Sequence, residues 1–163
     1  MFSLFAKAPP PAYRPIGLER SAECALVHAA SFAYPWDETD FEQLLVRPEV
    51  LAEGAIETSD CSLSGFILSR AALDEAEILT IAVIPERRRC GVGAALLATH
   101  FAALWARGVT QLFLEVDADN AAARSLYAAS GFRQVATRES YYRKTGARPA
   151  SALVMRLDLS EQF

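Results

Sequence analysis

The sequence of 163 residues is poor in the side chains that build disulfide frameworks and metal centres. Its three cysteines, Cys24, Cys61 and Cys90, are odd in number for a disulfide set and too widely spaced for a C-x-x-C metal pair. A reducing compartment is the simplest expectation, so we predict a cytoplasmic protein. The two histidines, His28 and His100, have no further ligands clustered around them. We therefore predict no metal site and interpret both histidines as partly buried helical residues.

Long hydrophobic runs and an excess of positive charge are also missing. No apolar stretch approaches the ~18–20 residues of a membrane span, so we expect no membrane anchor. The N-terminus lacks a basic segment followed by a long apolar one, so we expect no secretory signal. The formal net charge of −4 argues against a general nucleic-acid binder. With 52% hydrophobic and 22% charged residues, the composition is typical of a globular domain with a sizeable core.

The patterning along the chain predicts a single α/β domain. Residues 1–15 contain Pro9-Pro10-Pro11, which offers no ladder donors, so we expect a flexible N-terminal arm followed by one domain over residues 16–160. Apolar spacing and breakers predict helices near 19–33, from about 39 to 48, over 91–107 and over 120–130. Strands are predicted over 50–58, 64–72, 77–83, 111–116, 132–142 and 152–159. This order indicates a mixed sheet rather than a doubly wound one.

The segment ILTIAVIPERRRCGVGA, from Ile78 to Ala94, predicts a buried strand, an arginine-rich turn and a helix start. Gly91 and Gly93 let the backbone come close to a ligand, and the helix start offers unpaired N–H groups at the positive end of the helix dipole. The spacing differs from the G-x-G-x-x-G of dinucleotide-binding folds and lacks the Gly-Lys-Ser/Thr of a nucleotide P-loop. The triplet Arg87-Arg88-Arg89 alone indicates a solvated turn, but beside the two glycines it favours an anion site.

A single carboxylate interrupts the apolar strand predicted over 111–116. The neighbours of Glu115 are Phe113, Leu114 and Val116, which predict burial on both faces of the strand. A buried carboxylate is costly unless it is paired or functional. Two interpretations stay open: Glu115 is half exposed or paired with an arginine, or it is a base whose pKa is raised by desolvation.

Asn120 and Tyr127 belong to the helix that follows. Either Asp119 or Asn120 caps this helix, and a cap does not exclude a ligand contact by the other residue. Tyr127 lies seven residues after Asn120, about two turns on, so both side chains can project to a similar side. On its own, a tyrosine in an amphipathic helix is typical of the core.

The two motifs together resemble the GCN5-related N-acetyltransferases. The turn Arg88-x-x-Gly91-x-Gly93 is similar to the pyrophosphate-binding motif of that superfamily. The phrase Asn120-x-x-Ala123-x-x-Leu126-Tyr127-x-x-x-Gly131-Phe132 is similar to its downstream motif. The resemblance implies a single α/β domain with a mixed, mostly antiparallel sheet, flanked by helices and split between two central strands. It also implies acetyl-coenzyme A as the cosubstrate, bound in that split, with no metal.

The resemblance also implies roles for single residues. Asn120 would contact the coenzyme, Glu115 would accept the amine proton directly or through water, and Tyr127 would protonate the departing thiolate. Main-chain groups that would position the pantetheine and the acetyl carbonyl belong to Ile81, Ala82 and Val83. Backbone groups that would hold the pyrophosphate belong to Arg88, Arg89, Cys90, Gly91, Val92, Gly93 and Ala94. A covalent route through Cys90 is disfavoured, because this residue lies in the phosphate loop.

Shorter phrases narrow the resemblance to the ribosomal-protein alanine N-acetyltransferases (the RimI type), over roughly residues 20–159. These phrases include Ala33-Tyr34-Pro35-Trp36, Leu114-Glu115-Val116 and the pair Tyr141-Tyr142. The resemblance implies direct acetyl transfer, in a ternary complex, to a protein N-terminal α-amine, namely alanine of a small-subunit ribosomal protein. No membrane or direct nucleic-acid partner is expected.

One segment departs from the family pattern and leaves the acceptor open. Pro149-Ala150-Ser151 stands where members of the family often carry acidic residues. The alternatives are an acetyltransferase for another amine, such as a protein lysine, a polyamine or an antibiotic, and a non-catalytic acyl-coenzyme-A sensor. A nucleic-acid module would rest on Arg87-Arg88-Arg89 alone, and the acidic total weighs against it.

Overall fold

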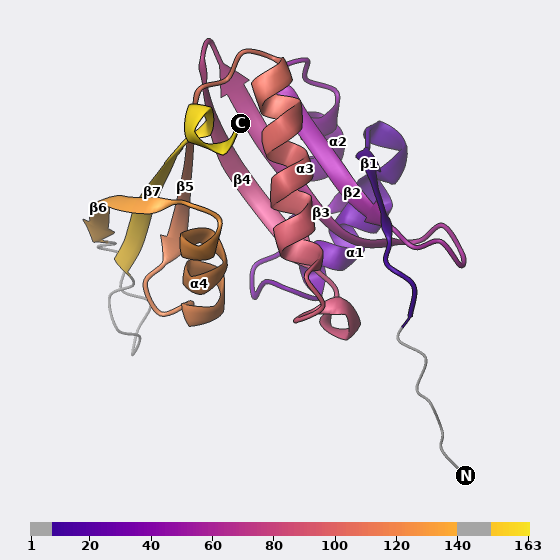
Figure 1. Cartoon of the computed structure of the whole chain (residues 1–163). Coiled ribbons are helices and arrows are strands. Elements are labelled where there is room, and N and C mark those ends of the chain that lie inside the picture. The colour runs from indigo at the N-terminus through magenta and orange to yellow at the C-terminus, as the bar shows by residue number, and fades with distance from the viewer. Residues whose placement is uncertain (1–7, 140–150) are drawn as a thin grey trace.

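The computed structural model describes residues 8–139 and 151–163, and its core is a seven-stranded sheet with the order β1-β2-β3-β4-β5-β7-β6 (Figure 1). The strands are β1 Ala12–Pro15, β2 Val50–Ile56, β3 Leu63–Ala72, β4 Glu75–Val83, β5 Gln111–Asp117, β6 Arg133–Glu139 and β7 Ser151–Asp158. The helices are α1 Ser21–Ala29, α2 Glu38–Leu45, α3 Val92–Ala106 and α4 Ala121–Ala129. Short 3-10 turns span Leu18–Arg20, Pro85–Arg87 and Leu159–Gln162. In these described segments, no helix is long and apolar enough to cross a membrane.

The sheet is mixed and mostly antiparallel, as the sequence predicts. β4 and β5 pair in parallel, and each of the other neighbouring pairs of strands is antiparallel. The order of helices and strands after residue 16 matches the prediction, although the first helix ends at Ala29, earlier than expected. The predicted pair of C-terminal strands is present as β6 and β7, while Tyr141 and Tyr142 lie outside the described residues.

The prediction of a flexible arm over residues 1–15 is wrong at its C-terminal end. Ala12–Pro15 forms β1, which pairs with β2 and places Tyr13 opposite Ala55. β1 is an edge strand, and a proline at the end of an edge strand costs the sheet no hydrogen bond. The domain therefore includes residues 12–15, and residues 1–7 lie outside the described part.

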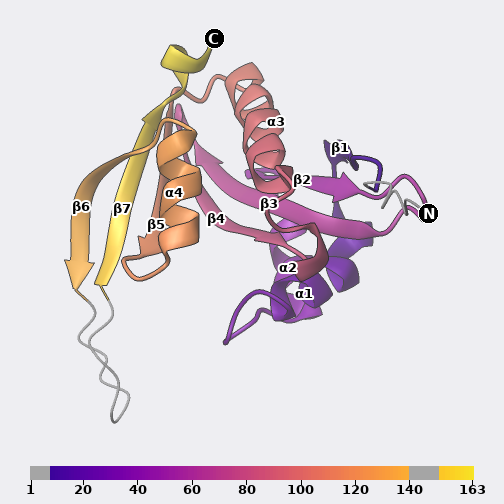
Figure 2. The same cartoon turned by 60° about the horizontal axis from the view of Figure 1, so that its bottom comes forward.

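The helices cover the two faces of the sheet, with α1 and α2 on one side and α3 on the other (Figures 1 and 2). The buried side chains accordingly form two clusters. On the α1 and α2 side, Cys24 and Phe41 pack with Phe66 and Leu68 of β3. On the α3 side, the larger cluster includes Leu96, Leu97, Phe101 and Leu104 of α3, together with Leu112, Leu114 and Val116 of β5.

A buried polar group also anchors α3 to the sheet. His100 of α3 is fully buried, where the sequence predicted only partial burial. Its Nδ1 is bonded to Glu53 of β2, and its Nε2 lies 2.6 Å from the hydroxyl of Ser69 on β3. Because removing one partner of a buried pair costs about 3–5 kcal/mol, this group holds α3 in register against β2 and β3. The N-terminus of α3 is thereby positioned beside β4.

The predicted split between two central strands is present between β4 and β5. Only three residue pairs join them, from Glu75 opposite Gln111 to Glu77 opposite Phe113. Just beyond, Ser69 of β3 faces Ile78 and Leu68 faces Thr80, so Leu79 is an extra residue on β4. Such a bulge bends its strand and increases the twist. The two strands then diverge, as Figure 2 shows.

Candidate active site

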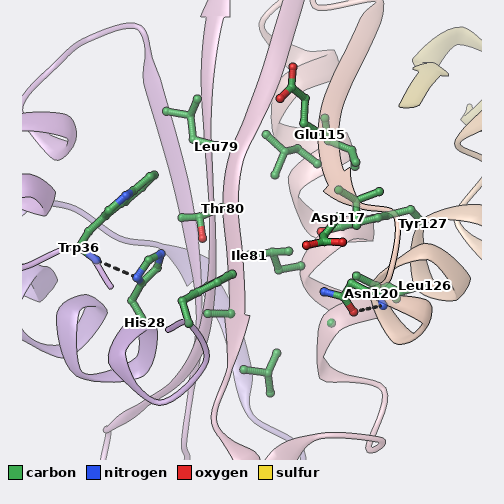
Figure 3. Close-up of a pocket in the computed structure, with 18 of the residues that line it drawn as sticks. His28, Trp36, Leu79, Thr80, Ile81, Glu115, Asp117, Asn120, Leu126 and Tyr127 are labelled. Carbon is green, nitrogen blue, oxygen red and sulfur yellow. Dashed lines mark hydrogen bonds between the residues drawn. The ribbon is translucent and has the colours of Figure 1, made fainter. Parts of the chain in front are cut away.

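A cavity of about 720 Å³ occupies the split. One wall is formed by residues 78–83 of β4 and the opposite wall by residues 114–117 of β5. Further lining residues come from α1 and the segment after it, from the start of α3, and from α4: His28, Phe32, Tyr34, Trp36, Gly93, Asn120, Ala123, Leu126 and Tyr127 (Figure 3). The cavity is therefore lined by elements from both faces of the sheet, so that two substrates can meet inside it.

The start of α3 borders this cavity and leaves several donors free. Gly91 is the N-cap residue with φ of 81°, and no side chain caps this helix. The N–H of Ala95 bonds to the carbonyl of Gly91 at 3.0 Å, which is the first turn of the helical ladder. The N–H groups of residues 92–94 therefore have no partner in the helix. Together with the helix dipole they favour an anion at this end.

Two side chains of the arginine triplet are engaged in contacts within the protein. Arg87 pairs with Glu57, lowering the pKa of that carboxyl through their hydrogen bonds, and also donates to the carbonyl of Pro9. Arg88 donates to the carbonyl of Val83 at 3.0 Å and to that of Ala30, after α1, at 3.2 Å. Two of the three guanidinium groups therefore tie the turn to its surroundings. Of the triplet, only Arg89 has a side chain without a hydrogen bond or ion pair to the described residues.

The two glycines of the turn differ in their surroundings. A side chain at Gly91 would meet no atom within 4 Å, so this position is open to an approaching ligand. A Cβ at Gly93 would come within 3.2 Å of Leu126 on α4. Gly93 thus also allows α4 to pack closely against the start of α3.

Tyr127 and Asn120 of α4 both line the cavity, as their predicted common orientation requires. The phenol of Tyr127 is buried, which raises its pKa to about 12, and its ring packs edge-on against Phe132 at 5.7 Å. A phenol with this pKa is protonated at neutral pH and can donate a proton. The side-chain oxygen of Asn120 accepts the N–H of Ala123 at 3.1 Å and caps α4, so its NH₂ group is left for a ligand.

The predicted burial of Glu115 is wrong. Leu114 and Val116 point into the α3 core, so Glu115 alternates to the opposite face of β5, where its side chain is 38% exposed. There its carboxylate pairs with Arg138 at 2.9 Å, which is the alternative interpretation of the sequence. The apolar neighbours of Glu115 predicted burial on both faces, but β5 no longer pairs with β4 at this point, which leaves the face of Glu115 open. Glu115 nevertheless lines the cavity, so its position suits a base although the desolvation argument fails.

Sequence reasoning missed three further polar residues that line the cavity: His28, Thr80 and Asp117. His28 was dismissed as an isolated histidine, and no local signal shows that Trp36 holds its ring. Thr80 interrupts the apolar strand ILTIAV, the same kind of signal that singled out Glu115, and could have been found that way. Asp117 ends β5 and has no local signal of its own in the sequence. Its carboxylate accepts the N–H of Asp119 at 2.8 Å.

Residues 18–132 match the sequence profile of the acetyltransferase (GNAT) family. The chain belongs to this family. The GNAT enzyme described here is 36% identical, over 134 residues, to the [ribosomal protein bS18]-alanine N-acetyltransferase of Escherichia coli strain K12, covering 82% of this chain and 88% of that relative. The crystal structure of the Escherichia coli ribosomal-protein-S18-alanine N-acetyltransferase aligns with a TM-score of 0.81 at 32% identity, over 91% of this chain and 93% of that one. Arabidopsis thaliana NAA60 in complex with acetyl-CoA shares the fold, with a TM-score of 0.80 at 18% identity over 91% of this chain and 98% of that one.

Proposed function

We propose that this acetyltransferase acetylates the α-amine of a protein N-terminus, with the N-terminal alanine of a small-subunit ribosomal protein as its acceptor. The observation that carries this proposal is the cavity in the split, which has free N–H donors of α3 near one end and Glu115 on the opposite face of the sheet. The ribosomal-protein relative, aligned over most of both chains, supports the choice of acceptor. We further propose that the enzyme works in the cytoplasm, where its three free cysteines stay reduced.

The residues present fit acetyl-coenzyme A, the cosubstrate of the family. Backbone N–H groups of residues 89–94 would hold the pyrophosphate, with Gly91 leaving space for it, whereas the N–H of Arg88 already bonds to the carbonyl of Pro85. Beyond Glu77, the β5-facing edge of β4 pairs with no strand in the part of the chain that the structure describes. Main-chain groups of Ile81, Ala82 and Val83 are then available to bond an extended pantetheine arm, as a sheet edge bonds an added strand. The side-chain NH₂ of Asn120 would add a contact from α4.

The chemistry needs one proton removed and one supplied. The thioester provides an activated acetyl carbonyl, and the attacking amine must be neutral. Glu115 would accept the amine proton, directly or through water, and the phenol of Tyr127 would protonate the departing thiolate. An α-amine with pKa ~7.7–8.0 is roughly 10–20% neutral at pH 7, whereas a lysine with pKa ~10.4 is about 0.04% neutral. An exposed, paired carboxylate suits an α-amine better than a lysine, because a larger fraction of the α-amine is already neutral at pH 7.

A direct test uses the purified protein, acetyl-coenzyme A and two synthetic peptides, with products located by mass spectrometry. One peptide begins with a free alanine, taken from a small-subunit ribosomal protein, and the other has the same sequence with a blocked N-terminus and one internal lysine. We expect acetylation of the free N-terminus. Faster acetylation of the lysine would overturn the proposed acceptor and favour a different amine.

Gly91→Val is expected to weaken acetyl-coenzyme A binding by placing a side chain where the phosphates approach. The matched control is Gly108→Val at the far end of α3, because both glycines have positive φ, 81° and 84°, and open space around the Cβ. Both variants therefore carry similar backbone strain, and only the first blocks the proposed site. Calorimetry would measure the dissociation constant of each. Equal affinity in the two variants would contradict this placement of the pyrophosphate.

A further inference from the structure

Two polar side chains that the proposed chemistry does not use face the cavity from the α1 side of the sheet. Thr80 pairs with Leu68, which belongs to the α1 and α2 cluster, so Thr80 points to that face. His28 lies on α1, which packs there, and Figure 3 shows the two side chains on the same side of β4. Glu115 shares this face, because its neighbour Leu114 points to the α3 side. The coenzyme donors at the start of α3 lie on the other face.

The imidazole of His28 is a fixed hydrogen-bond donor. Its Nδ1 accepts the backbone N–H of Trp36 at 3.0 Å, and burial lowers the pKa of the ring, so the neutral ring carries its proton on Nε2. The ring is held by Trp36, stacked at 4.9 Å, and by Phe32 at 4.3 Å. Nε2 bonds to none of the described residues, and His28 is one of the side chains that line the cavity.

The hydroxyl of Thr80 is unsatisfied in the described part of the chain. The residue is only 6% exposed, and its Oγ1 is buried without a hydrogen-bond partner. A buried polar group left unpaired destabilises the folded protein. Valine would fill the same place in this apolar strand without that cost. The hydroxyl therefore points to a ligand that completes its hydrogen bonding inside the cavity.

We propose that His28 Nε2–H and the Thr80 hydroxyl bind the carbonyl oxygen of the acceptor's first residue. This inference rests on the proposed function, since it needs a peptide N-terminus as the acceptor. Two donors from one face suit a single acceptor oxygen, and the carbonyl of the first residue is separated from its α-amine by only the Cα. Holding that oxygen places the amine on the same face as Glu115. A lysine ε-amine has no carbonyl at this distance, so the pair selects α-amines over ε-amines.

The test is steady-state kinetics of Thr80→Val and Thr80→Ser with the alanine-starting peptide. Thr80→Val is expected to raise the KM for the peptide about 3- to 10-fold, the range for one lost hydrogen bond. The affinity for acetyl-coenzyme A should not change, and the Tm should stay equal or rise because an unsatisfied hydroxyl is gone. Thr80→Ser keeps the hydroxyl and should restore the peptide KM. His28→Phe, checked for its Tm, should raise the same KM.

The ratio of α- to ε-acetylation distinguishes a contact to the acceptor carbonyl from a contact to the thioester. In Thr80→Val, acetylation of the lysine peptide should persist, so the ratio of α- to ε-acetylation falls by about 3- to 10-fold, again one hydrogen bond. An unchanged peptide KM in Thr80→Val overturns the inference while leaving the proposed function standing. An equal fall for both peptides, or a matching loss of coenzyme affinity, would show that the donors serve the thioester instead. A wild-type protein that leaves the alanine peptide unmodified overturns the function and the inference together.

Discussion

Tyr127→Phe is expected to lower turnover by about 10²–10⁴-fold, the usual contribution of a positioned acid. The affinity for acetyl-coenzyme A should hardly change, because only one hydroxyl is removed. The ring keeps its edge-on contact with Phe132, so the fold should survive. Since burial raises the pKa of this phenol to about 12, the acid stays protonated through the neutral and mildly alkaline range. The loss of turnover should therefore be nearly constant from pH 6 to about 9, a range that lies more than two pH units below that pKa.

Single-turnover and steady-state rates, with calorimetry for coenzyme binding, would measure this deficit. The control is Tyr13→Phe on β1, a partly buried tyrosine that does not line the cavity. It should retain wild-type turnover. If Tyr127→Phe also turns over at the wild-type rate, Tyr127 is a core residue only.

Glu115→Gln is expected to reduce turnover by a comparable factor, about 10²–10⁴-fold, while the fold survives. The amide keeps the shape of the side chain and removes the base. Its ion pair with Arg138 is largely exposed, 38% and 72% for the two side chains, and such pairs contribute about 0–1 kcal/mol. The Tm should thus move little. Activity should partly recover above pH 8, because an α-amine of pKa ~7.7–8.0 is then mostly neutral without help.

A pH series of kcat/KM for the two proteins would measure that recovery. Glu77→Gln is the matched control, since Glu77 shares a strand with the cavity wall but does not line the cavity. It should behave as wild type. Full activity of Glu115→Gln at pH 7 would remove the assignment of the base, and the carboxylate of Asp117 in the same cavity would become the next candidate to substitute.

Several features of this chain follow from short stretches of sequence. Gly91, Gly108 and Gly131 all have positive φ and stand at the predicted helix ends, because few other residues adopt that backbone without strain. Asn120, one of the two residues predicted as the cap, caps α4, and α3 begins within one residue of its predicted start. The order of elements, the family and the position of Tyr127 also follow, because each depends on residues close together in the chain.

Other features depend on elements that are distant in sequence. The exposure of Glu115 depends on where β5 parts from β4, and neither strand shows the separation alone. The partners of Arg87 and Arg88 come from the segments just after β2 and α1, from the end of β4 and from the N-terminal segment. β1 exists because β2 offers an edge to the segment after the prolines.

Local sequence is enough to predict the sites of chain reversal, the helix start that offers its N–H groups, and the α4 motif that carries Asn120 and Tyr127. These are set by backbone preferences and hydrogen bonds within a few residues. Which polar groups face the cavity depends instead on how distant segments pack together. Thr80 faces the α1 side of the sheet because β4 is in register with β3, and His28 keeps its proton on Nε2 because Trp36 donates to the other nitrogen. Register and packing between distant segments set these contacts, and no local pattern encodes them.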